Sequence, residues 1–214
     1  MGYETPQSKR TLKKRAYRTY RQSIAPVFER RRRERILGLA ASVCKTSPEK
    51  PKLLEVGCGL GKDFLRHFDA DPEYQLFGLD MRDLPGRLGS FEFIEADASD
   101  IPFEDNHFEV AVSIGVLEHV SPVVKLDQVT AEIARVSKYF IVVVPGMGTL
   151  LEPHVMQFRW QTRSDSRRAA DDHLFYYSDE AWLQMSGFRD ARAERFSYVP
   201  GLIQNLLITN IPPL

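Results

Sequence analysis

Short apolar runs alternate with amphipathic stretches from Pro51 to about residue 145. Apolar runs of this length predict buried strands, and apolar residues spaced three or four positions apart predict helices. Strands that alternate with helices predict an α/β fold, in which helices cover both faces of a mostly parallel sheet. The expected strands are Lys52–Val56, Gln75–Leu79, Phe91–Ile94, Phe108–Ser113 and Tyr139–Val144, and the expected helices are Lys62–Phe68 and Val123–Val136.

The last third of the chain has a different pattern. Residues 146–177 have no clear period, and so long an irregular stretch predicts a functional loop or a cap insertion. A helix is expected at about 178–186, with Ser178 as its N-cap and Gly187 at its end. Two strands that flank a short turn predict an antiparallel pair. They are Ala193–Tyr198 and Ile203–Thr209.

Residues 1–46 are expected to form a basic N-terminal helical extension or lid ahead of a main domain at 47–214. Residues 8–22 carry apolar side chains, Tyr17 and Tyr20 among them, at helical spacing between basic residues. Pro26 interrupts this pattern, and a second helical pattern then continues to Val43.

The net charge of zero conceals an uneven distribution. Residues 1–38 hold twelve Lys/Arg and three Asp/Glu, whereas residues 39–214 hold 17 Lys/Arg and 26 Asp/Glu. A basic arm beside an acidic body has two interpretations that the sequence leaves open. The arm packs on the body, or it contacts RNA, an anionic membrane or an anionic substrate.

Composition excludes several classes of protein. The two cysteines, Cys44 and Cys58, are too few for a disulfide framework, and no Cys/His cluster has the spacing of a zinc site. No run of 18 apolar residues predicts a membrane span, and the first 30 residues lack the apolar core of a signal peptide. We therefore expect a globular, cytoplasmic protein.

The main chemical signal is a glycine-rich turn between the first expected strand and the helix after it. Residues 53–61 read Leu-Leu-Glu-Val-Gly-Cys-Gly-Leu-Gly, and glycines at such a turn let a ligand approach the backbone closely. The next two strands each lead into an acid, Asp80 and Asp97. Ligands of open α/β sheets bind at the carboxyl ends of the strands, so both acids are expected beside the glycines.

In these features the chain resembles the class I S-adenosylmethionine-dependent methyltransferases, in particular their small single-domain branch. The matching residues are the E-x-G-x-G-x-G run at 55–61, Asp80, the run 96–98, the acidic turn before Phe108, and the run 114–120. The resemblance covers residues 50–145 well and implies a Rossmann-like seven-stranded sheet, mostly parallel, whose last strand is antiparallel. It also implies that 47–214 is the methyltransferase domain and that S-adenosyl-L-methionine is the cofactor.

The resemblance assigns roles to individual residues. The run from Glu55 to Gly61 would pass under the methionine and ribose of the cofactor, and Asp80 would hold the ribose hydroxyls. Asp97 would accept a hydrogen bond from the adenine amino group, and the backbone at 113–114 would face the methionine amine. The full set of expected cofactor residues is Glu55, Gly57, Cys58, Gly59, Gly61, Asp80, Met81, Asp97, Ala98, Ser113 and Ile114.

Other interpretations of these residues stay open. The glycines can form a plain strand-to-helix turn, Asp97 can be a turn residue, and Cys58 can be no more than a small loop residue. Asp80 would also suit a dinucleotide site. However, the third glycine follows the second by two positions, not by the three of G-x-G-x-x-G, which favours the sulfonium cofactor.

Candidate residues for the methyl acceptor follow the fourth and fifth expected strands. His119 and His154 are candidate general bases, although a structural role for His119 is an alternative. The expected substrate-binding residues are Glu118, Tyr17, Tyr20, Phe158, Trp160 and Tyr176. Some RNA-end methyltransferases bind a metal through E-x-x-E-H. Because Gly115 stands in place of the first glutamate here, we expect no metal site.

Together these features predict a methyltransferase that acts on a small molecule, with oxygen slightly favoured as the target atom. The chain lacks the N-P-P-Y or D-P-P-Y run of amino-directed nucleic-acid enzymes. Two alternatives remain: a methyltransferase for RNA or for an anionic lipid or glycan, and a methyltransferase-like binding protein without turnover. The oligomeric state is not predicted.

Overall fold

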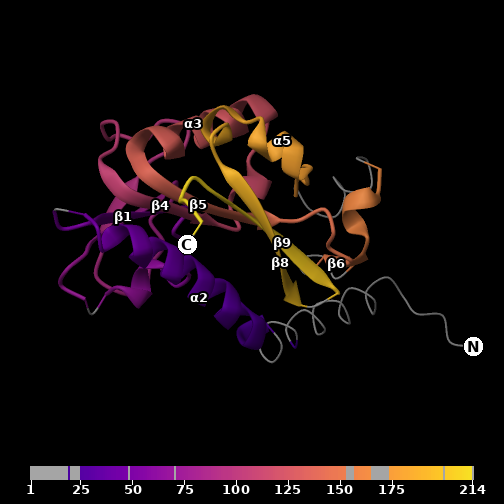
Figure 1. The fold of residues 1–214 in the computed structure, drawn as a ribbon, viewed down its shortest axis with the longest axis horizontal. Coiled ribbons are helices and arrows are strands. Elements are labelled where there is room, and N and C mark those ends of the chain that lie inside the picture. The colour runs from indigo at the N-terminus through magenta and orange to yellow at the C-terminus, as the bar shows by residue number, and fades with distance from the viewer. Residues whose placement is uncertain are drawn as a thin grey trace, which may run out of the picture.

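The sheet at the centre of the molecule has seven strands in the order β3-β2-β1-β4-β5-β9-β8 (Figure 1). The computed structural model describes residues 25–47, 49–69, 71–152, 157–164, 174–199 and 201–213, together with Thr19. The strands of this sheet are β1 (Lys52–Val56), β2 (Gln75–Asp80), β3 (Glu92–Glu95), β4 (Phe108–Ile114), β5 (Ser137–Pro145), β8 (Arg192–Val199) and β9 (Ile203–Thr209).

The strand directions agree with the expected fold class. Strands β1 to β5 pair in parallel, whereas β9 runs antiparallel to both of its neighbours, β5 and β8. The expected bounds of β1 and β9 are confirmed, and the other strands differ by one or two residues at one or both ends. The Rossmann-like sheet with an antiparallel last strand is therefore confirmed.

One face of the sheet is covered by α3 (Val123–Val136) and α5 (Asp179–Leu183), which lie on the same side in Figure 1. The bounds of α3 are those predicted. Apolar residues spaced three to four positions apart along α3, such as Leu126, Val129 and Ile133, are fully buried against the strands. This spacing gives a helix one continuous apolar stripe, which explains why α3 packs along its whole length.

The opposite face is covered by α2 (Ala25–Cys44) and the short 3₁₀ turn η2 (Leu65–His67). Pro26 lies in the first turn of α2, where a missing backbone N–H costs nothing. In the second half of α2, residues such as Ile36 and Leu39 are buried in the same cluster as Val110 and Val112 of β4. The first expected helix, at 8–22, lies outside the described residues apart from Thr19.

The predicted helix at 62–68 is wrong, because this segment contains only turns and η2. The reason lies in its hydrogen bonds. The backbone N–H of Leu65 donates to Oε2 of Glu55 at 3.2 Å, and that of Arg66 donates to the carbonyl of Gly61, five residues earlier. With both donors taken, the repeating bonds of an α-helix do not form. No helix N-terminus therefore faces the glycine turn in this part of the chain.

The predicted helix at 178–186 begins correctly and ends too late. The hydroxyl of Ser178 caps α5 by accepting from the backbone N–H of Ala181 at 3.2 Å. Gly187, expected to end this helix, lies instead inside the 3₁₀ turn η5 (Ser186–Phe188). A Cβ at Gly187 would lie 1.9 Å from the carbonyl oxygen of Thr130. Glycine is therefore required here because η5 packs directly on the backbone of α3.

Within the expected cap at 146–177, the described residues form a small hairpin and a turn. These are β6 (Leu151–Glu152), which pairs antiparallel with β7 (Gln157–Phe158), and the 3₁₀ turn η4 (Trp160–Thr162). Trp160 and Tyr176 form a separate apolar cluster with Leu174, and the hydroxyl of Tyr176 donates to the buried carboxylate of Glu152. None of the described helices is long and apolar enough to span a membrane.

Candidate functional site

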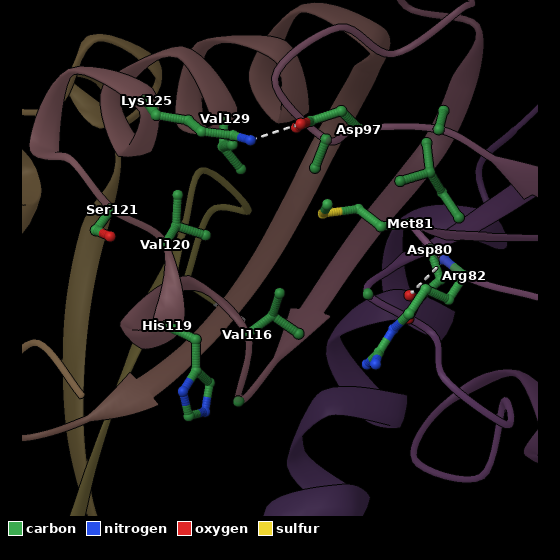
Figure 2. Close-up of a pocket in the computed structure, with 15 residues that line it drawn as sticks. Asp80, Met81, Arg82, Asp97, Val116, His119, Val120, Ser121, Lys125 and Val129 are labelled. Atoms are coloured by element: carbon green, nitrogen blue, oxygen red, sulfur yellow. Dashed lines mark hydrogen bonds and ion pairs between the residues drawn. The ribbon is translucent and has the colours of Figure 1, made fainter. Parts of the chain in front are cut away.

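A cleft of about 550 Å³ lies at the carboxyl ends of the parallel strands (Figure 2). The turns after β1, β2 and β4, the segment after β3, and the first half of α3 all contribute to its walls. Its lining residues are Gly57, Leu79, Asp80, Met81, Arg82, Ala96, Asp97, Ala98, Gly115, Val116, His119, Val120, Ser121, Lys125 and Val129.

Asp80 ends β2 and anchors two turns of the cleft wall. Its Oδ2 accepts from the backbone N–H of Gly59 at 3.0 Å, and its Oδ1 accepts from that of Arg82 at 3.2 Å. Each oxygen of a carboxylate accepts two hydrogen bonds, so each keeps one acceptor position. Asp80 can therefore hold the glycine turn and accept two further hydroxyl donors at the same time.

Asp97 follows β3 and is ion-paired with Lys125 of α3, whose Nζ lies 2.5 Å from Oδ2 (Figure 2). Its Oδ1 accepts from both the backbone N–H and the hydroxyl of Ser99. The hydrogen bond from Lys125, followed by those from Ser99, lowers the pKa of Asp97 to about 2. At neutral pH Asp97 is thus a carboxylate, and its Oδ2 retains one acceptor position toward the cleft.

Gly57 brings the backbone of the turn after β1 close to the turn after β4. Its φ of +74° is a conformation that side chains disfavour, and a Cβ there would lie 2.5 Å from Cγ2 of Val116. The backbone N–H of Gly57 donates to the carbonyl of Leu79 at 2.7 Å, which ties the turn to β2. Glycine at position 57 therefore leaves space between the turn after β1 and Val116, at the lining of the cleft.

The middle of the cleft is apolar. Figure 2 shows Met81 pointing into the space between Asp97 and Val116, and 62% of the Met81 surface is exposed. Ala98 and Val129 line the same part of the cleft. A flat aromatic ring would fit between such side chains, and a polar group on the edge of that ring would face Asp97.

His119 lies on the 3₁₀ turn η3 (Leu117–His119), toward the end of the cleft opposite Lys125 and Asp97 (Figure 2). The adjacent Glu118 is 1% exposed and does not line the cleft. The carbonyl of Glu118 accepts from the backbone N–H of Phe175 at 2.8 Å. The η3 turn thus connects the cleft wall to the described end of the cap region.

Among the expected cofactor residues, the structure brings together Gly57, Asp80, Met81, Asp97 and Ala98 as lining residues. The others are absent from the lining. Glu55 bonds to the backbone at Leu65, and its burial raises its pKa to about 8. The remaining expected residues that do not line the cleft are Cys58, Gly59, Gly61, Ser113 and Ile114.

Cys58 is buried beside Gly78, where a Cβ at position 78 would lie 2.9 Å from its Sγ. Burial, reinforced by the charges of Glu55 and Asp80, raises the pKa of the Cys58 thiol to about 12. Because a thiol with this pKa stays protonated at neutral pH, it is a packing group and not a nucleophile.

The expected substrate residues of the cap do not reach the cleft lining. Trp160 is fully buried and Tyr176 nearly so in their own cluster, whereas Phe158 is 65% exposed. The remaining candidates, His154, Tyr17 and Tyr20, lie outside the described residues. The described part of the chain holds no group of three His, Cys, Asp or Glu side chains suited to a metal.

Sequence reasoning missed Lys125, Arg82 and Ser121 as lining residues. Lys125 was hidden by its position, because a lysine on an amphipathic helix ordinarily faces solvent. Arg82 lies two residues after Asp80, so the rule that ligands bind beyond strand ends would have found it.

A family model described as "Methyltransferase domain" matches residues 54–139. No functionally curated protein matches the chain in sequence. Among solved structures, the PH0226 protein of Pyrococcus horikoshii is 22% identical with a TM-score of 0.57, over 84% of this chain and 91% of that one.

A second similar structure is a Burkholderia thailandensis 1,6-didemethyltoxoflavin N1-methyltransferase with bound 1,6-didemethyltoxoflavin and S-adenosylhomocysteine. It is 13% identical with a TM-score of 0.55, over 98% of this chain and 91% of that one. At these identities the two structural matches show the fold alone.

Proposed function

We propose that this chain, which belongs to the class I S-adenosylmethionine-dependent methyltransferases, transfers a methyl group to a small-molecule acceptor, preferably to a hydroxyl oxygen. The observation that carries the proposal is the pair of carboxylates, Asp80 and Asp97, on neighbouring strand ends across an apolar slot. A nucleoside presents matching donors, with two ribose hydroxyls at one end and an amino group on a flat ring at the other.

The residues of the cleft suit the cofactor of this family. Asp80 would accept from the ribose hydroxyls with the acceptor positions that its backbone bonds leave. Asp97 would accept from the adenine amino group beside Lys125, and Met81 with Ala98 would contact the ring. A Cβ at Gly57 would narrow the floor of the cleft, so glycine there gives the amino-acid part of the cofactor room.

The chemistry requires little from the protein beyond placement. When bound, S-adenosylmethionine supplies an electrophilic methyl group on a sulfonium that leaves as a neutral thioether. Alignment of two reactants in this way contributes about 7–11 kcal/mol to lowering the barrier. Apolar lining residues, Val116 and Val120 among them, would limit the access of water to the space where the acceptor would lie.

His119 favours a hydroxyl acceptor. A hydroxyl group must lose its proton as it reacts, and histidine is the side chain that most often accepts a proton in catalysis. His119 is the imidazole among the described lining residues and lies toward the end opposite Asp97. Such a base contributes roughly 10²–10⁴-fold to the rate.

The proposal is tested by calorimetric titration with S-adenosylmethionine and S-adenosylhomocysteine. We expect micromolar binding by the unaltered chain. Asp80→Ala should weaken it by about two orders of magnitude, because two charge-assisted hydrogen bonds are lost. Asp100→Ala is the matched control, since it removes an exposed carboxylate outside the cleft lining.

Circular dichroism of each variant verifies the fold. A folded, unaltered chain that binds neither compound would contradict the proposed enzyme and favour a binding protein without turnover. Equal weakening by both variants would contradict the role of Asp80.

A further inference from the structure

A second, smaller pocket lies beside the cleft, between α2, the glycine turn and the end of β4. Arg32, Arg33 and Ile36 of α2 line it together with Lys62, Asp63 and Ile114. We refer to these six residues as the cationic pocket. Its volume is about 20 Å³, which admits the terminal atoms of a group but not a ring.

The cationic pocket carries more positive than negative charge. Three cations, Arg32, Arg33 and Lys62, face the single carboxylate of Asp63. Two neighbouring arginines of α2 are neutralised elsewhere, since Arg30 pairs with Glu34 and Arg35 pairs with Glu194 of β8, each at 2.7 Å.

Within the described part of the chain, Arg33 and Lys62 have no such partner. Among the described residues, neither side chain has a carboxylate within ion-pairing distance. The charge of Arg33 acts on a neighbouring side chain: after burial, it is the next cause that lowers the pKa of His67. Cations gathered around one pocket produce a field that attracts an anion.

The position of the cationic pocket is away from the part of the cleft that would hold the adenine. Ile114 lines it and directly precedes Gly115 and Val116, which line the cleft. In Figure 2 the indigo ribbon of α2 lies on the same side as Asp80 and Arg82, away from Lys125 and Asp97. The pocket is therefore on the side of the cleft away from Asp97, where the proposed function places the adenine.

We propose, on the basis of the proposed function, that the cationic pocket binds an anionic group of the methyl acceptor, a carboxylate or a phosphate. A guanidinium group binds either one through two parallel hydrogen bonds, and Lys62 adds a point charge. The acceptor is then a small anion whose reactive atom lies in the cleft while its charged end is held by α2. This interpretation gives the basic helix a role in substrate selection.

The first test uses inorganic phosphate as the probe, titrated by calorimetry into the unaltered chain at low ionic strength. We expect saturable binding that the double variant Arg33→Gln/Lys62→Gln weakens at least about tenfold, as the loss of charge-assisted hydrogen bonds predicts. The matched control is Arg31→Gln/Lys45→Gln, which changes the charge equally at exposed positions outside both pockets. Equal binding of phosphate by the two double variants would overturn the proposal. The overall positive charge of the basic region, and not the cationic pocket, would then account for the binding.

The second test separates the acceptor from the cofactor as the source of the anion. S-adenosylhomocysteine has a carboxylate, whereas 5′-methylthioadenosine has the same nucleoside without it. If the cationic pocket serves the acceptor, Arg33→Gln/Lys62→Gln leaves the affinity for both compounds unchanged. Selective weakening of S-adenosylhomocysteine would overturn the acceptor assignment.

The same titrations distinguish the two proposals. If the unaltered chain binds neither nucleoside, the proposed function and the acceptor assignment both fail, whatever phosphate shows. If it binds S-adenosylhomocysteine but not phosphate, only the acceptor assignment fails. A third outcome is salt-sensitive binding of an RNA oligonucleotide that both double variants weaken equally. This outcome would also overturn the acceptor assignment, because the basic N-terminal region would then bind a polyanion.

Discussion

Glu55 is a buried acid whose side chain stabilises the turn that follows the glycines. Its Oε2 accepts from the backbone N–H of Leu65, and its burial raises its pKa to about 8. A group whose pKa is higher in the folded than in the unfolded chain binds an extra proton on folding. Its contribution to stability is complete below the unfolded pKa of about 4.3 and is lost as the pH rises through 8.

Glu55→Gln should therefore change the pH dependence of stability. The neutral amide retains an oxygen that accepts from Leu65 and has no proton to lose. We expect the variant and the unaltered chain to have similar free energies of unfolding at pH 5, and the variant to be the more stable at pH 9. Urea denaturation across this range measures both, and a difference that does not vary with pH would contradict the assignment.

At the scale of elements, the contact between α3 and η5 depends on the lack of a side chain at Gly187. A Cβ there would lie 1.9 Å from the carbonyl oxygen of Thr130 and 2.3 Å from its carbonyl carbon. Since both atoms belong to helix backbone, they cannot move aside independently of α3. The two elements must separate to admit even a methyl group.

Gly187→Ala should lower the free energy of unfolding by about 1–3 kcal/mol, as overpacking does. Gly38→Ala is the matched control, because Gly38 lies in α2 and a methyl group added there would meet no atom within 4 Å. It should raise stability by up to about 1 kcal/mol through helix propensity. Thermal and urea denaturation measure the change in the free energy of unfolding, which should be negative for Gly187→Ala and positive for Gly38→Ala. A Gly187→Ala variant as stable as the unaltered chain would contradict the close contact.

At the scale of the whole molecule, α2 is one of the layers that bury the sheet. Leu39 and Ala40 are fully buried in the cluster that also contains Leu53 and Val112. The expected division between an extension at 1–46 and a domain at 47–214 stays a prediction. The packing of α2 nevertheless means that a chain beginning at residue 47 would expose one face of the sheet.

Removal of residues 1–46 should consequently abolish the cooperative unfolding transition. The matched control is removal of residues 1–24, which keeps every described residue of this cluster and should leave the transition in place. Differential scanning calorimetry of the two shortened chains measures the effect. A cooperative transition in the chain from residue 47 would show that the domain folds without α2.

Much of the fold was predictable because its signals are local. Apolar runs such as 139–144 must be buried wherever the chain takes them, and alternation with helices leaves few arrangements other than a parallel sheet. The glycine at position 57 and the acids at positions 80 and 97 follow the ends of strands. Parallel strands bring such residues to the same edge of the sheet, so sequence alone predicted a cleft there.

The contents of the cleft were decided only by tertiary structure. Lys125 pairs with Asp97, 28 residues earlier in the sequence, because the packing of α3 on the sheet brings the two side chains together. Glu55 belongs to the expected motif but points to η2, since successive residues of a strand face opposite sides. The cationic pocket joins α2, the glycine turn and β4, which are distant in sequence. Local patterns determine which elements form, whereas the packing between them determines which side chains meet.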